Sequence, residues 1–180
     1  MTFALQDDAK HDDVAGPGNG FIDVFKTDGE WKSRFESNGV LNSPWGLALA
    51  PASFGQFGQR LLVGNFGDGR INVFEFPSGG ACVGTLRDTL GLPLTINGLW
   101  ALKFGSGGPS GSKSHLLFTA GIGDEGHGLF GFIRPVETDD QGIAYCWVYW
   151  AGAREIAPLF AFTGTEGKDG SSIDAFGQGA

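Results

Sequence analysis

Long hydrophobic runs, charge and cysteine are all scarce in this sequence of 180 residues. No window approaches 18 consecutive apolar residues, so we expect no membrane-spanning helix. Four aspartates stand among the first 13 residues, where a signal peptide needs positive charge and an apolar core, so we expect no signal peptide in this chain. Cys82 and Cys146 permit one disulfide, but two free thiols are the expectation.

Recognisable catalytic and nucleotide-binding motifs are also absent. The sequence contains no EF-hand loop, HExxH, GxSxG, Walker A or CxxC pattern. The formal net charge of −8 and the pI of about 4.7 disfavour binding to nucleic acid or to anionic membranes, because both need a basic face. An acidic surface of this kind suits cationic ligands or Ca²⁺ instead. No reaction is fixed by these features.

Glycine is the residue present in excess. The chain has 32 glycines without a Gly-X-Y period, which excludes collagen and predicts many tight turns. Between these turns lie apolar runs of five to seven residues, a length that suits strands. No capped helical pattern exceeds two turns. We therefore expect an all-β protein.

A repeat relates two parts of the chain. A shift of 55 residues superimposes Asn42 on Asn97, Trp45 on Trp100 and residues 61–63 on 116–118. A further pair of similar strings is found at 18–25 and 67–74. Four strands repeating near 50 residues are typical of the blades of a β-propeller. A β-sandwich would also give many short strands, but it would not explain the repeat.

The predicted fold is a β-propeller fragment of about two to three four-stranded blades, which does not close a ring by itself. Its complete blade covers about residues 44–88, with strands at 45–50, 60–65, 70–76 and 81–86. Flanking strands are predicted at 2–5, 20–25, 31–35, 99–104, 116–120 and 128–133. We expect residues 1–134 to form the partial propeller and residues 135–180 to form a tail outside it. The run 143–151 combines high β-propensity with no charge, which predicts either a buried strand or an aggregation-prone segment.

Several long strings resemble an uncharacterised bacterial family of NHL-like β-propeller proteins. They lie at 10–20, 41–48, 62–72 and 124–131, and the resemblance extends over about residues 3–133. Many members of that family are exported and some carry a PEP-CTERM sorting signal, so the resemblance implies export. It also implies a full ring, of which this chain is similar to the C-terminal third, and it brings no catalytic activity.

This chain departs from that pattern at both ends. Blades upstream of Met1 are missing, and the tail from Val136 onward does not resemble the family. A truncated or frame-shifted gene product explains both departures most simply. Self-association of several copies to complete the ring is the alternative.

The topology of a propeller brings one set of loops to the rim of the central channel. We expect seven candidate ligand residues there: Asp13, Asn42, Asp68, Asn97, Asp124, Glu125 and His127. Oxygen ligands of this kind suit a hard cation such as Ca²⁺. The alternative role for each acidic residue is to cap its own glycine-rich turn, which we favour for Asp68 and, less strongly, for Asp124 and Glu125. A structural loop role is favoured for Asn42 and Asn97.

The two repeated tryptophans also have two interpretations. Trp45 and Trp100 start equivalent strands, which favours packing between blades over a platform for stacking sugars. On function, the first hypothesis is a binding or scaffold module without a reaction. The second is a divalent-cation-dependent hydrolase, similar in architecture to propeller lactonases, that acts at the rim. A third is a broken gene product without independent function.

Overall fold

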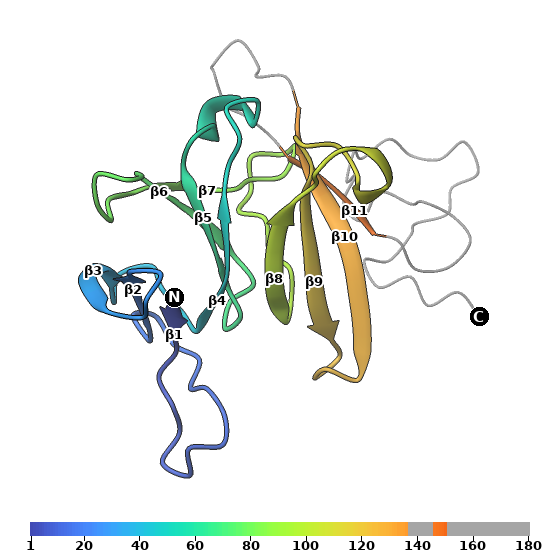
Figure 1. Ribbon diagram of the computed structural model, residues 1–180. Coiled ribbons are helices and arrows are strands. Elements are labelled where there is room, and N and C mark those ends of the chain that lie inside the picture. The colour runs from blue at the N-terminus through green and yellow to red at the C-terminus, as the bar shows by residue number, and fades with distance from the viewer. Residues whose placement is uncertain (137–145, 151–180) are drawn as a thin grey trace.

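The computed structural model describes residues 1–136 and 146–150, and its described part is almost entirely β (Figure 1). The strands are β1 (Thr2–Phe3), β2 (Phe21–Phe25), β3 (Trp31–Ser37), β4 (Pro44–Leu49), β5 (Leu61–Asn65), β6 (Ile71–Phe74), β7 (Cys82–Thr85), β8 (Leu99–Phe104), β9 (Leu116–Ile122), β10 (His127–Pro135) and β11 (Cys146–Trp150). Two 3₁₀ turns, Gly55–Phe57 and Gly108–Ser110, are the only helical elements in the described ranges. The all-β fold class is confirmed, and the strands lie within a few residues of their predicted positions.

The strands form three antiparallel sheets. Sheet 1 has the order β1-β2-β3, sheet 2 the order β4-β5-β6-β7, and sheet 3 the order β11-β10-β9-β8. Each sheet is an up-and-down meander in which sequence neighbours pair, and short glycine-containing turns make the β5–β6 and β9–β10 connections. No sheet of the described residues closes into a barrel.

The fourth strand of sheet 3 comes from the region 135–180. β11 pairs with β10 along five residues, from Gly131↔Trp150 to Pro135↔Cys146. It lies inside the run 143–151, for which the composition predicted either a buried strand or an aggregation-prone segment. Sheet 3 therefore continues across the position where the family resemblance ends.

The sheets stack face to face, and sheet 2 lies in the middle (Figure 1). Its central strands carry nearly continuous apolar residues because both of their faces are covered. In β5, Leu62 points into the larger core shared with sheet 3, whereas Val63 points into a smaller core shared with sheet 1. The larger core also takes Leu99, Leu116 and Phe118 of sheet 3, each at most 1% exposed.

The first strands of sheets 2 and 3, β4 and β8, approach each other closely. A Cβ at Gly46 would lie 2.8 Å from the carbonyl oxygen of Trp100 and 3.0 Å from the backbone nitrogen of Leu102. Only glycine fits at this separation. The contact sets the position of the two tryptophan-bearing strands relative to each other.

Sheet 1 is smaller, and its one charged core residue is paired. Asp23 is buried at 6% exposure and accepts hydrogen bonds from the guanidinium of Arg34 on β3. That guanidinium also lies 3.8 Å from the ring centroid of Phe21, which stacks on Phe3 of β1.

In the described part of the chain, no helix is long and apolar enough to cross a membrane.

Candidate functional site

The loops predicted to form a rim follow one another along one edge of the molecule. The Gly16 amide donates to Oδ1 of Asn42 at 2.7 Å, and the Gly67 amide donates to its carbonyl oxygen at 3.1 Å. Farther along, the Ile96 amide donates to the Gly69 carbonyl at 2.9 Å, and the Gly121 amide donates to the Gly98 carbonyl at 2.8 Å. Hydrogen bonds thus link the loop before β2, the β3–β4 loop that contains Asn42, the β5–β6 turn, the β7–β8 loop and the end of β9.

Asn42 and Asn97 occupy equivalent repeat positions but different surroundings. The Asn42 side chain is 7% exposed, and a Cβ at Gly67 would lie 2.0 Å from its Oδ1. Its amide oxygen therefore joins two loops and has no room for a ligand. Asn97 lies in the β7–β8 loop with its side chain exposed.

Two of the candidate aspartates are half-buried and belong to turns. The Asp68 carboxylate accepts the backbone N–H of Arg70 at 3.1 Å, which is the geometry of an Asx-turn. Asp13 forms an isolated bridge with Gln6, and its backbone N–H donates to Oδ1 of Asp12 at 2.8 Å.

The remaining three candidates lie at the β9–β10 turn. Asp124 and Glu125 have φ angles of 50° and 62°, in the left-handed region, and the Gly126 amide donates to the Gly123 carbonyl at 2.9 Å. His127 starts β10 directly after this turn. All three side chains are exposed, and Glu125 is the one that reaches another strand.

These residues do not assemble into a metal centre within the described ranges. Residues 1–136 and 146–150 contain no group of three or more His, Cys, Asp and Glu side chains placed to hold a metal ion. Hydrogen bonds connect the loops, but the candidate carboxylates lie apart from one another along the edge.

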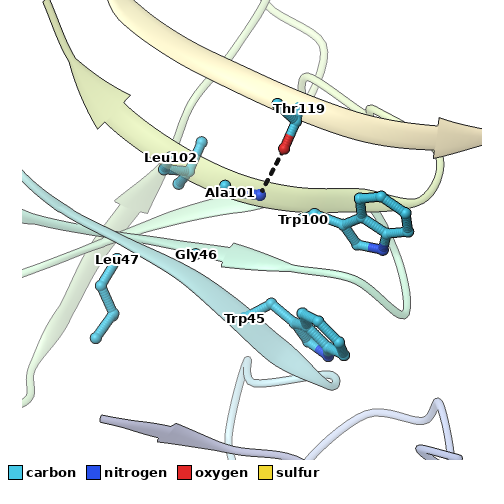
Figure 2. A pocket seen from close by; sticks show the side chains of 7 residues that line it. All are labelled: Trp45, Gly46, Leu47, Trp100, Ala101, Leu102 and Thr119. Atoms are coloured by element: carbon cyan, nitrogen blue, oxygen red, sulfur yellow. Dashed lines mark hydrogen bonds between the residues drawn. The ribbon is translucent and has the colours of Figure 1, made fainter. Parts of the chain in front are cut away.

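A groove lies beside this edge, between the first strands of sheets 2 and 3. It has a volume of about 430 Å³. Its lining comes from β4, β8 and β9: Trp45, Gly46, Leu47, Trp100, Ala101, Leu102 and Thr119. Figure 2 shows both indoles projecting on the same side of the groove, and it shows the Ala101 amide donating to Oγ1 of Thr119, at 3.3 Å. We refer to it as the tryptophan groove.

Each indole is held by the turn of its own sheet. The Trp100 indole N–H donates to Oε1 of Glu125 at 3.2 Å, and its ring lies over Gly121, where a Cβ would be 3.2 Å away. The Trp45 ring is 5.8 Å from that of Phe66 in the β5–β6 turn, centroid to centroid. Trp45 remains 51% exposed.

The expectation that both tryptophans pack between sheets is wrong for Trp45, because half of this residue stays exposed. On β4 the residues that face the larger core are Gly46 and Ala48, so Trp45 belongs to the face turned toward sheet 1, where it is not covered. A signal for this existed in the alternation of β4, where small residues alternate with large ones. The Trp100–Glu125 contact was not visible in the sequence, because 25 residues separate its partners.

One histidine outside the groove has a shifted pKa. The pKa of His115 is lowered because partial burial removes water from the ring, and because the Arg134 guanidinium disfavours a second positive charge. Its ring stacks on Phe132 with centroids 4.4 Å apart.

Comparison with known proteins gives relatives of viral origin. The chain is 49% identical over 89 residues to uncharacterized protein L690 of Acanthamoeba polyphaga mimivirus, a match that covers 49% of this chain and 23% of the relative. It is 40% identical over 121 residues to uncharacterized protein R648 of the same virus, covering 67% of this chain and 28% of the relative. Uncharacterized protein R640 is 37% identical over 107 residues, covering 59% and 20%.

The chain spans about a quarter of the length of these relatives. No family model and no solved structure matches it. The resemblance to a bacterial NHL-like family is therefore wrong, because the similar proteins are viral and no family model supports that assignment. The strings that carried the resemblance lie in the loop before β2, in β4, in β5 and the start of β6, and in the β9–β10 turn with the start of β10. Some of their glycines are required by close packing, as at Gly67 beside the Asn42 side chain and at Gly69 beside the Ile96 backbone, so they do not identify a family.

Proposed function

We propose that this chain forms part of a β-propeller that works as a binding module, with the tryptophan groove as its ligand site. Three stacked antiparallel meanders and the 55-residue repeat support the architecture. The observation that carries the binding role is the pair of repeat-equivalent indoles, Trp45 and Trp100, in one groove (Figure 2). The Trp100 indole is held by Glu125 and packs on Gly121, which lowers the entropy it loses on binding.

The proposed ligand is an organic cation with an alkylammonium group. Indole faces attract such cations more strongly than other aromatic rings do. The Glu125 carboxylate is hydrogen-bonded to Trp100 through one oxygen, so negative charge stands beside the indole. The net charge of −8 raises the local concentration of cations at the surface. A metal-dependent hydrolase is not proposed, because no observation on the described residues favours it.

The test compares two probes of the same shape. Choline and 3,3-dimethylbutan-1-ol differ in the charge of the branched end, so a difference in their binding isolates the cation–π contribution. We expect choline to shift the indole N–H signals of Trp45 and Trp100 in NMR spectra, with at least about tenfold tighter binding than the neutral alcohol.

Trp31 provides the internal control. It lies on β3, is 55% exposed and does not line the tryptophan groove. Trp45→Ala and Trp100→Ala are expected to abolish choline binding, and Trp31→Ala to leave it unchanged. Equal shifts at Trp31, or equal affinity for the neutral probe, would show that choline has no specific site in the groove.

A further inference from the structure

Three asparagines of this chain are followed directly by glycine: Asn19, Asn38 and Asn97. Glycine has no side chain to shield its backbone nitrogen, so this nitrogen can attack the side-chain amide of the preceding asparagine. The attack requires access of water and a backbone that can rotate the two groups toward each other. Because the three pairs share this chemistry, their surroundings in the folded protein decide which of them reacts.

The pair Asn19–Gly20 is held by hydrogen bonds and by packing. Nδ2 of Asn19 donates to the Val14 carbonyl at 2.9 Å, so the side-chain amide is already engaged. The Gly20 N–H donates to the Gly18 carbonyl at 3.1 Å. A Cβ at Gly20 would lie 2.3 Å from Cδ of Pro44, so the pair has little room to rotate. Both reacting groups are therefore restrained.

The pair Asn97–Gly98 is fixed through its backbone, although the Asn97 side chain is exposed. The Gly98 carbonyl accepts the Gly121 N–H at 2.8 Å, and a Cβ at Gly98 would lie 2.0 Å from the Gly121 carbonyl oxygen. On the other side of the pair, the Ile96 N–H donates to the Gly69 carbonyl at 2.9 Å. Rotation of this pair would break contacts with both β9 and the β5–β6 turn.

The pair Asn38–Gly39, in the β3–β4 connection, is open. Asn38, Gly39 and Val40 are all exposed, and a Cβ at Gly39 would meet nothing within 4 Å. Among the described residues, none forms a hydrogen bond with the Asn38 side-chain amide or with the Gly39 N–H. The anchors of this turn lie outside the reacting groups: the Asn38 N–H donates to the Gly20 carbonyl, and the Leu41 N–H donates to the Asn38 carbonyl, each at 3.0 Å.

We propose that Asn38 is a site of spontaneous modification, at which the folded protein converts to aspartyl and isoaspartyl forms without an enzyme. The Gly39 nitrogen loses its proton and bonds to Cγ of Asn38, and the side-chain nitrogen leaves as ammonia. Water then opens the resulting cyclic succinimide. Cleavage between the nitrogen and Cγ gives aspartate, and cleavage between the nitrogen and the backbone carbonyl carbon gives isoaspartate. One water enters and one ammonia leaves in either case.

The modified turn lies directly before buried contacts. The Val40 carbonyl accepts hydrogen bonds from Nδ2 of Asn65 at 2.9 Å and from Nδ2 of Asn72 at 3.2 Å, and Leu41 is fully buried. The isoaspartyl form at Asn38 adds one methylene to the main chain next to these groups. We expect this form to unfold at a lower urea concentration than the unmodified chain.

The experiment incubates the full chain in mildly alkaline buffer and follows the three pairs by peptide mapping with mass spectrometry. Exchange of an amide NH₂ for OH raises the peptide mass, and chromatography separates the aspartyl from the isoaspartyl peptide. A parallel sample in guanidinium chloride gives the rate of each pair without structure. We expect folding to slow the reaction at Asn38 by at least about tenfold less than at Asn19 or Asn97.

Two matched glycine variants test the role of the Gly39 nitrogen. Gly39 and Gly79 both have positive φ angles, 56° and 95°, and a Cβ at either would meet nothing within 4 Å. Gly39→Ala shields the attacking nitrogen and is expected to slow the reaction at Asn38 by at least about fivefold. Gly79→Ala carries a similar backbone strain away from any asparagine and is expected to leave the rate unchanged.

Two results would overturn the proposal. The first is equal slowing of all three pairs by folding, because Asn38 would then react only from the unfolded chain. The second is an equal effect of Gly39→Ala and Gly79→Ala on the rate at Asn38. The first comparison uses the parent chain alone, so it decides the matter even where an alanine variant does not fold.

Discussion

The two sides of β4 show the same strand in two states of packing. Toward β8 the strand approaches so closely that a side chain at position 46 has no room, and the neighbouring core residues are buried. Toward sheet 1 the strand meets a two-residue partner, β1, and Leu49 stays largely exposed. The comparison indicates that more of the stability resides between sheets 2 and 3 than on the side of β4 that faces sheet 1.

The largest predicted effect is a difference in the unfolding free energy lost when Leu99 of β8 and Leu49 of β4 are each replaced by alanine. Leu99→Ala deletes a fully buried side chain from the larger core and is expected to lower the free energy of unfolding by about 2–5 kcal/mol. Leu49→Ala, on the open side of β4, is expected to cost less than about 1 kcal/mol. Urea unfolding followed by tryptophan fluorescence measures both. Similar losses would show that the two sides of β4 contribute equally to stability.

The next effect tests the close approach of β4 and β8. Gly46→Ala places a Cβ against backbone atoms of Trp100 and Leu102, and it is expected to cost about 1–3 kcal/mol. Gly128→Ala is the control, since a Cβ at that position in β10 meets nothing within 4 Å. We expect the control to be neutral or slightly stabilising. Equal stability of the two variants would mean that the strands separate without cost.

A smaller difference in stability is expected between alanine variants of the two repeat-equivalent asparagines, Asn42 and Asn97. Asn42→Ala removes the acceptor of the Gly16 amide and is expected to cost about 1–2 kcal/mol. Asn97→Ala changes an exposed side chain and is expected to cost less than about 0.5 kcal/mol. Thermal or urea unfolding of the pair checks this. The reverse order would return Asn42 to the set of ligand candidates.

The positions of the strands could be predicted because each is a short apolar run between glycine-rich turns. Leu99–Phe104 is an example in which the predicted and observed bounds agree. The capping role of Asp68 was also predictable, since an aspartate between glycines caps its turn through atoms two residues away. Signals of this kind are local.

Long-range features of the site could not be predicted in the same way. The repeat gave Asn42 and Asn97 equal status, but Gly16 approaches Asn42 from another sheet and distinguishes them. Likewise, the composition of 143–151 indicated a buried strand or an aggregation-prone segment without identifying β10 as its partner. The exposure of Trp45 depends on which element covers β4, and this is decided by how the sheets pack on one another.

The smallest effect concerns His115, at the start of β9 on the face of sheet 3 that points away from β4. Its pKa is lowered in the folded protein by partial desolvation and by Arg134. As the pH falls below about 6.5, the ordinary pKa of histidine, the unfolded chain therefore takes up a proton before the folded chain does. The contribution of His115 to stability is complete above that pH and declines as the pH falls toward the lowered value.

His115→Gln removes this titration. The difference in unfolding free energy between the parent protein and the variant is therefore expected to rise as the pH is raised from 5 to about 7. Urea unfolding at several pH values measures the difference. Phe132→Leu, which removes the stacked ring, should reduce the same pH dependence if the desolvation comes from that contact. A difference that falls with rising pH would mean that the folded protein favours the charged imidazole, so that a negative charge or an acceptor near the ring outweighs the desolvation of His115.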